Sequence, residues 1–212
     1  MSKQAITLIV VFSLGFAVGR YLNIDPSVLK VWLEYLLYLL LFFIGISISD
    51  EVLKLRNVSE FLGELLKLVS STLLGSALGG TLAGAIILLS GYPAELGFSD
   101  PALVVRYGIA VSIGMGWYTF TGAILSMRGA FLGFLGFTSN LSRELITFLL
   151  YPLLPRKLRI SGISMGGATT MDTTLPVIHR FGGPKASLLS FVHGLILTLL
   201  VPIILPLIAS PG

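Results

Sequence analysis

The chain has 212 residues, of which 55% are hydrophobic and 11% are charged, and its formal net charge is +4. Soluble domains carry about 25% charged residues, so this composition excludes a water-soluble globular protein and indicates one membrane domain over residues 1–212. The basic residues stand singly between apolar runs, which excludes a nucleic-acid-binding stripe. The absence of cysteine excludes disulfides, thiolate metal sites and cysteine nucleophiles.

Three apolar runs make up the N-terminal part of the chain. They cover residues 5–19, 28–48 and 62–89. The first is short for a span, follows only Lys3 and has no cleavage motif, so we interpret it as a retained helix rather than a signal peptide. The other two are long enough to cross a bilayer, since about 20 residues suffice. Small residues around Gly80 and Gly84 permit close contact with another helix. We expect residues 1–90 to form a scaffold with possible dimerisation helices.

Two interrupted apolar segments make up the rest of the chain, each followed by a more regular helix. The segments cover residues 101–126 and 158–181, their breaks lie at 114–119 and 166–174, and the helices cover 131–154 and 185–208. Corresponding features are offset by about 50 residues, which indicates an internal repeat. Its two copies would be residues 101–154 and 158–208.

The distribution of basic residues predicts the topology. With Lys3 inside, three crossings place Lys54 inside and the acidic loop at 91–100 outside, as the positive-inside rule requires. The basic cluster at 156–159 falls inside only if residues 101–126 enter and return as a hairpin. We therefore expect an all-α polytopic membrane protein of about five full transmembrane helices plus two oppositely oriented re-entrant or broken-helix hairpins, an inverted repeat.

This arrangement is typical of secondary transporters, in which irregular backbone at the midplane lines a cavity. We expect the two tips to meet near the middle of the plasma membrane, with the N-terminus cytoplasmic and the C-terminus outside. Crossing broken helices in place of hairpins stay an open alternative.

Polar residues within the helix at 131–154 mark a candidate site. One helix face carries all four of them, since Arg143, Glu144 and Thr147 follow Asn140 by 3, 4 and 7 positions. An ionisable group at that depth costs about 2.5–3.5 kcal/mol, so Glu144 should face a partner or water. The structural alternative is that Arg143 and Glu144 neutralise each other or neighbouring groups.

Asp172 lies in the second break among Thr169, Thr170, Thr173 and further threonines. A lone carboxylate among hydroxyls and free backbone carbonyls suits an ammonium group or Na⁺. The alternative is a structural role.

Three further side chains have both a functional and a structural interpretation. Trp117 and Tyr118 in the first break could form a cation-π wall, or belong to an interfacial belt. His193 could carry protons, or be a hydrogen-bonded packing residue.

Four motifs carry a resemblance to a known family. They are Gly116-Trp117-Tyr118-Thr119-Phe120-Thr121-Gly122, Asn140-Leu141-Ser142-Arg143-Glu144-Leu145, Gly166-Gly167-Ala168-Thr169-Thr170-Met171-Asp172-Thr173-Thr174-Leu175-Pro176 and His193-Gly194. In this order and spacing they resemble the LysO lysine exporters over essentially the whole chain. The resemblance implies an inner-membrane exporter of L-lysine and its analogue thialysine, with Glu144 and Asp172 at the acidic positions. Longer members have additional N-terminal segments, and their absence here favours a homodimer.

Together these observations predict a proton-coupled antiporter that exports L-lysine by alternating access, with no cofactor or metal and with Na⁺ as the other possible coupling ion. A cation channel is the main alternative, and an intramembrane hydrolase is a weaker one because no catalytic motif supports it. The expected substrate-binding residues are Glu144, Asp172, Asn140, Arg143, Trp117, Tyr118, Gly116, Gly166, Gly167, Thr169, Thr170 and Thr173. The expected proton-coupling residues are Glu144, Asp172 and His193.

Overall fold

The computed structural model describes residues 3–21, 58–90 and 100–210, together with isolated positions between 35 and 49. Every regular element of this described part is helical. The predicted span at residues 28–48 and the loop at 91–99 lie mostly or wholly outside it. The all-helical expectation is therefore confirmed for the described residues.

Two long apolar helices dominate the molecule. α3 covers Val58–Leu89 with 32 residues, and α8 covers Pro184–Ala209 with 26 residues. At 1.5 Å per residue they extend about 48 and about 39 Å, more than the roughly 30 Å hydrocarbon core of a bilayer. Within the described ranges, these are the two helices with the length and composition of a membrane span, as expected for a helical membrane protein.

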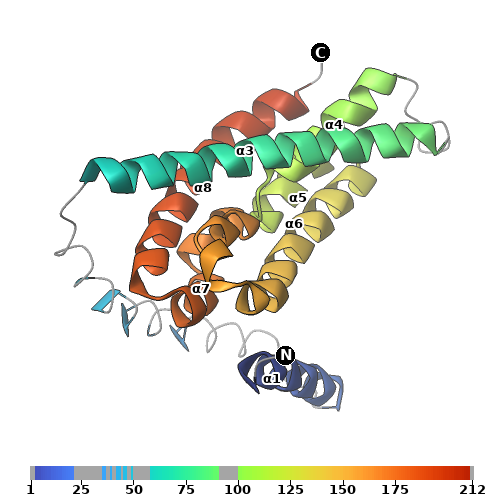
Figure 1. Ribbon diagram of the computed structural model, residues 1–212. Coiled ribbons are helices and arrows are strands. Elements are labelled where there is room, and N and C mark those ends of the chain that lie inside the picture. Colours follow the sequence, from blue (N-terminus) through green and yellow to red (C-terminus); the bar gives the residue numbers. More distant parts are fainter. Residues whose placement is uncertain are drawn as a thin grey trace.

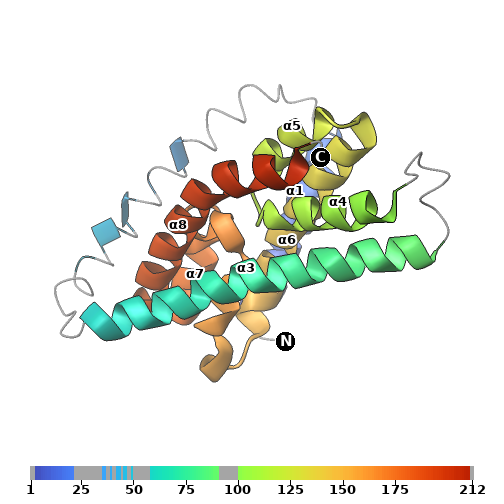
Figure 2. The same ribbon diagram turned by 90° about the horizontal axis from the view of Figure 1, so that it is seen from above.

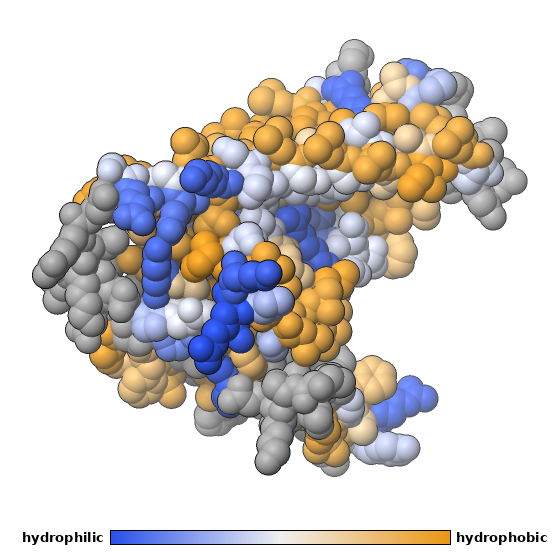
Figure 3. Space-filling view, in the orientation of Figure 1, coloured by the Kyte–Doolittle hydropathy of each residue, from blue (hydrophilic) through white to orange (hydrophobic). Residues whose placement is uncertain are grey.

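The surfaces of these helices suit lipid rather than water. Leu66, Leu74 and Leu78 on α3 are 64–67% exposed, and Figure 3 shows apolar side chains along much of this helix. Contiguous apolar surface of this kind is unusual on a soluble monomer. α1, which covers Lys3–Tyr21, lies at the edge of the molecule in Figure 1, and its described side chains are all exposed.

α3 and α4 pack through small residues. α4 covers Pro101–Ile113, and its first turn is capped by Asp100, whose side chain accepts a hydrogen bond from the Ala102 N–H. A Cβ on Gly80 would lie 2.5 Å from the Gly108 carbonyl oxygen, and one on Gly84 would lie 2.7 Å from the Val105 Cα. The two helices are therefore antiparallel and in backbone contact, which confirms the predicted role of the small residues in 62–89.

The first predicted break is confirmed. α4 ends at Ile113, and α5 begins only at Tyr118 and covers Tyr118–Ser126. Between them Met115 and Gly116 have positive φ angles of 47° and 98°, which a helix cannot include. α6, Ala130–Leu150, then packs antiparallel to α5, because Gly122 lies against Phe137 and Gly133 lies against Ser126.

The second break is also confirmed, but the arm that precedes it differs from a broken α-helix. Four short 3-10 helices follow α6. They are η1 Tyr151–Leu153, η2 Arg156–Leu158, η3 Ser161–Met165 and η4 Gly167–Met171. Each glycine in an α-helix costs about 1 kcal/mol relative to alanine, and the three glycines at 162, 166 and 167 make a continuous α-helix unfavourable there. α6 itself ends before the predicted residue 154, because Pro152 has no N–H to donate to the carbonyl of the preceding turn.

The chain then returns through α7, Leu175–Gly182, into α8. α8 runs in the same direction as α3, because Lys185 pairs with Glu64 and His193 bonds to Thr72. Figures 1 and 2 show α6 running the opposite way to α8. The long helices that follow the two breaks therefore have opposite directions.

Candidate functional site

The two breaks touch each other through their backbones. The Ala168 N–H donates to the Met115 carbonyl over 2.7 Å. A Cβ on Gly116 would lie 2.8 Å from the Gly166 carbonyl oxygen, and one on Gly167 would overlap the Met115 carbonyl. Gly167 also has a φ of +63°, which favours glycine. Segments about 50 residues apart are thus joined tip to tip.

A cavity of about 300 Å³ opens at this junction. Its lining comes from both tips and from α8, and consists of Gly116, Trp117, Tyr118, Thr119, Ala168, Thr169, Met171, Asp172, Thr173 and Thr198. The volume is at the lower end of the range for small-molecule sites, about 300–1,000 Å³. We call it the acidic cavity, since Asp172 is the charged residue of its lining.

Asp172 lies at the wall of this cavity with its carboxylate partly satisfied. Its Oδ1 accepts a hydrogen bond of 2.6 Å from the Thr173 N–H. The second tip therefore places a carboxylate in the wall of the cavity.

Glu144 projects from α6 toward the same region and is only 7% exposed. Its Oε2 atom and the Thr173 Oγ1 atom are both buried and neither makes a hydrogen bond of normal geometry with a described residue, although the Thr173 hydroxyl lies next to the Glu144 carboxylate. A buried acceptor without a partner costs about 1–3 kcal/mol, which a proton or a cation would relieve. Glu144 is absent from the cavity lining, so it stands behind Asp172 and Thr173.

The predicted aromatic pair lines the acidic cavity. The Trp117 ring lies 4.9 Å from that of Phe120, and the Tyr118 ring meets that of Phe137 edge to face at 5.3 Å. These contacts hold both side chains in place beside Asp172. Aromatic rings next to a carboxylate are suited to a cation.

Asn140 supports the first tip. Its Oδ1 accepts a hydrogen bond of 2.8 Å from the Gly116 N–H, and its amide nitrogen donates to the carbonyls of Val111 and Gly136. Both amide hydrogens are therefore engaged, one by α4 just before the break and one by the preceding turn of α6. This arrangement gives Asn140 a positioning role.

Arg143 supports the second break and does not pair with Glu144. Its guanidinium donates to the carbonyls of Ser164 and Met165 and to the Ser76 hydroxyl, each over 2.9 Å. An ion pair joins Lys185 to Glu64, and none is observed between Arg143 and Glu144 in the described part of the chain. Mutual neutralisation of Arg143 and Glu144 is therefore not observed.

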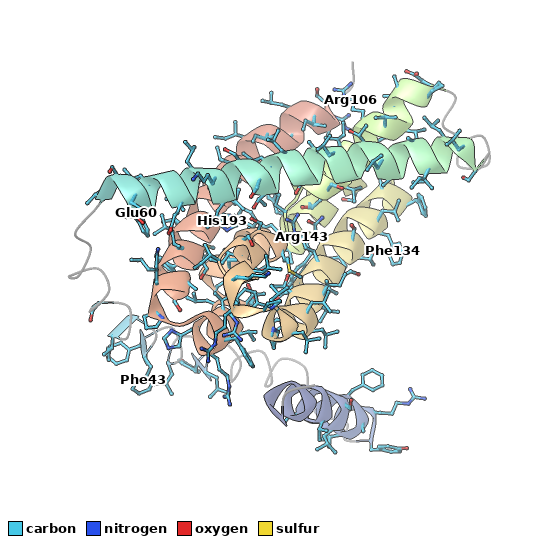
Figure 4. All side chains as sticks on the ribbon, in the orientation of Figure 1. Phe43, Glu60, Arg106, Phe134, Arg143 and His193 are labelled. Carbon is cyan, nitrogen blue, oxygen red and sulfur yellow. The ribbon has the colours of Figure 1, made fainter. Side chains whose placement is uncertain are left out.

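The second tip is further tied to α8 and α3 by His193. This side chain is fully buried, and its Nδ1 lies 3.0 Å from the Thr170 hydroxyl and its Nε2 lies 2.9 Å from the Thr72 hydroxyl. Figure 4 shows His193 and Arg143 in the space beneath α3. His193 and Thr170 are outside the lining of the acidic cavity, whereas Thr169 and Thr173 belong to it.

Two polar residues of the acidic cavity are absent from the predicted site, Thr119 in the first break and Thr198. Thr198 lies on α8, and its hydroxyl approaches the Met171 sulfur at 3.5 Å. Pro202, four residues later, has no N–H for the Thr198 carbonyl. A threonine four residues before a proline inside an apolar helix was the signal that could have identified it. Among the described residues, no three acidic or histidine side chains gather as a metal site.

Comparisons with known proteins identify relatives of this chain. The family model described as lysine exporter LysO matches residues 9–209. The lysine exporter LysO of Escherichia coli K12 is 34% identical over 206 residues, which are 97% of this chain and 64% of that protein. A Haemophilus influenzae protein named as a candidate lysine exporter is 29% identical over 177 residues, 83% of each chain. This chain thus spans just under two thirds of the Escherichia coli relative. No solved structure matches it.

Proposed function

The chain belongs to the lysine exporter LysO family, and we propose that it exports L-lysine, and analogues such as thialysine, across the plasma membrane by alternating access. The observation that carries this proposal is the acidic cavity at the junction of the two breaks. The family is one of transporters and not of enzymes, which removes the support for an intramembrane hydrolase.

We propose that the two broken segments form an inverted repeat of hairpins that enter the bilayer from opposite sides. Two observations support it. The tips meet through the hydrogen bond between Ala168 and Met115, and α6 and α8 run in opposite directions. In such an architecture the substrate binds between the repeats, and one repeat moves against the other.

The substrate's ammonium groups would bind at the acidic cavity. Asp172 reaches the cavity directly, and Glu144 lies behind it with an unpartnered oxygen. Trp117 and Tyr118 would flank the aliphatic chain and the terminal ammonium of lysine. A lysine in this cavity would meet the Asp172 carboxylate and two aromatic rings, with Glu144 behind them, which favours a cationic amino acid over a neutral one.

Coupling is needed because the membrane potential opposes export. Moving one positive charge out against an inside-negative potential costs about 2.3 kcal/mol per 100 mV. We propose proton antiport, in which protons bind Glu144 or Asp172 after lysine has left and so prevent its return. Na⁺ remains the other candidate ion, since hydroxyl and carboxylate oxygens surround Asp172.

We assign His193 a positioning role in this scheme. It lies outside the acidic cavity, and threonine hydroxyls meet both of its ring nitrogens. We also propose a homodimer, with the N-terminus cytoplasmic and the C-terminus outside according to the positive-inside rule.

Counterflow of radiolabelled lysine in proteoliposomes tests the proposal. We expect saturable exchange of external label for internal lysine, faster when an imposed proton gradient drives protons in the direction opposite to lysine. Exchange that a sodium gradient drives equally well would show that Na⁺ can serve as the coupling ion in place of the proton. Single-channel current steps without saturation would show that the protein is a channel and not a carrier. No lysine flux at all would refute the assignment.

A further inference from the structure

A second cavity, of about 270 Å³, lies behind the tips and differs in charge from the first. It is lined by Gly75, Ser76, Gly79, Ser112, Ser139, Asn140 and Arg143. We call it the basic cavity, because Arg143 is its charged residue and no Asp or Glu belongs to its described lining. Figure 3 shows hydrophilic side chains in a hollow below α3, where Figure 4 labels Arg143.

We propose that the basic cavity is a binding site for a carboxylate-type anion, held by Arg143. The guanidinium has five N–H donors, and three of them are used in the bonds to Ser76, Ser164 and Met165. Two N–H groups are therefore left without a protein acceptor in the described part of the chain. A guanidinium with its remaining donors in a cavity matches a carboxylate.

The rest of the lining is consistent with an anion. The hydroxyls of Ser112 and Ser139 line the cavity and make no hydrogen bond with a described residue. Gly75 and Gly79 leave open space next to α3, since a Cβ on either would have no neighbour within 4 Å. The cavity thus combines a fixed positive charge, free hydroxyl donors and room for a small molecule.

Both cavities border the joined tips. Asn140, from the basic cavity, accepts the hydrogen bond of Gly116, from the acidic cavity. A Cβ on Gly167 would lie 3.4 Å from the Arg143 Nε, so Arg143 stands directly behind the second tip. Arg143 and Glu144 are consecutive and hence about 100° apart around α6, and of the two only Arg143 lines the basic cavity.

The anion has two possible sources with the same chemistry. One is the α-carboxylate of the exported amino acid, and this source rests on the proposed function. The other is a free anion from the solution. The tip N–H groups are poor alternatives for a carboxylate, because those of Gly116, Gly166 and Ala168 already donate to protein oxygens.

Binding measurements on the full chain in lipid nanodiscs test the proposal. Radiolabelled lysine would be displaced by unlabelled lysine or by 1,5-diaminopentane, which is lysine without its carboxylate. A charge-assisted contact of this kind corresponds to about a 10- to 100-fold preference for lysine. We expect Arg143→Gln to remove this preference by weakening the binding of lysine and leaving that of 1,5-diaminopentane unchanged. Arg128→Gln, at an exposed position, is the matched control and should keep it.

A second variant covers the case in which Arg143→Gln does not fold. Ser139→Leu adds bulk at an exposed position of the cavity rim and leaves the three bonds of Arg143 intact, so it should reduce the preference as well. Thermal unfolding with and without sodium acetate measures the free-anion source. Stabilisation by acetate that is lost in Arg143→Gln or Ser139→Leu, with an unchanged lysine preference, would identify a free anion as the occupant.

The proposal is overturned if the folded variants keep both the wild-type preference for lysine and the wild-type response to acetate. If the unmodified protein binds no lysine, the transport assignment fails instead. In that case the unfolding measurement with acetate is by itself the test of whether the basic cavity binds an anion.

Discussion

Replacing Gly167 by alanine tests the contact between the two tips. Its φ of +63° is left-handed, which costs a residue with a Cβ about 1–2 kcal/mol. The new Cβ would overlap the Met115 carbonyl, which is backbone and cannot rotate away. The tips must therefore separate, and the hydrogen bond of 2.7 Å from the Ala168 N–H to that carbonyl is lost.

The expected loss follows from these two contributions. A lost backbone hydrogen bond adds about 0.5–1.5 kcal/mol to the backbone strain, so the free energy of unfolding should fall by roughly 1.5–3.5 kcal/mol. Because Gly116 and Ala168 line the acidic cavity, separation of the tips also deforms the binding site. We expect lysine counterflow per folded molecule to fall at least about 10-fold, the effect of roughly 1.4 kcal/mol on binding.

Gly183→Ala is the matched control. Gly183 has a φ of +82°, but a Cβ there would meet nothing within 4 Å, so this variant has the backbone strain without the collision. It should lose stability and keep its counterflow per folded molecule. Thermal unfolding in detergent and counterflow in proteoliposomes measure the two effects. Wild-type counterflow in Gly167→Ala would show that the tips are not in backbone contact.

Three further variants test other parts of the structure. Gly80→Leu should destabilise the protein by at least 2 kcal/mol, roughly the cost of an overpacked contact, whereas Gly79→Leu, which points into open space, should unfold at nearly the wild-type temperature. His193→Asn should lower the unfolding temperature, while lysine flux keeps its pH dependence. A flux that no longer responds to pH would show that His193 takes part in proton coupling. Lys185→Ala removes an exposed ion pair with Glu64 and should change the unfolding free energy by no more than about 1 kcal/mol. A larger loss would contradict its exposed position.

The sequence predicted the two breaks and the polar face of α6 well, for local reasons. Glycines and threonines concentrate where the helices end, and the spacing of Asn140, Glu144 and Thr147 identifies one helix face that the structure buries. The small residues of α3 likewise predicted its close contact with α4. These are properties of short stretches of chain, which helix periodicity and residue type determine.

The roles within the site could not be predicted in the same way. Asn140 and Arg143 share the polar face with Glu144, yet they bond to the breaks, and only the fold brings Ser76 of α3 to Arg143. The basic cavity depends on three helices that are distant in sequence. The 3-10 form of the arm before the second break was also missed, because the glycines at 162, 166 and 167 indicate that an α-helix is unfavourable without indicating which structure replaces it.

The most direct test of the account is lysine counterflow by Glu144→Gln and Asp172→Asn in proteoliposomes, with Asp100→Asn as the matched acid-to-amide control. Asparagine caps a helix as well as aspartate does, so the control should transport like the unmodified protein. We expect both site variants to fold, as judged by thermal unfolding, and to show no more lysine counterflow than liposomes without protein. Wild-type counterflow in both variants would contradict it.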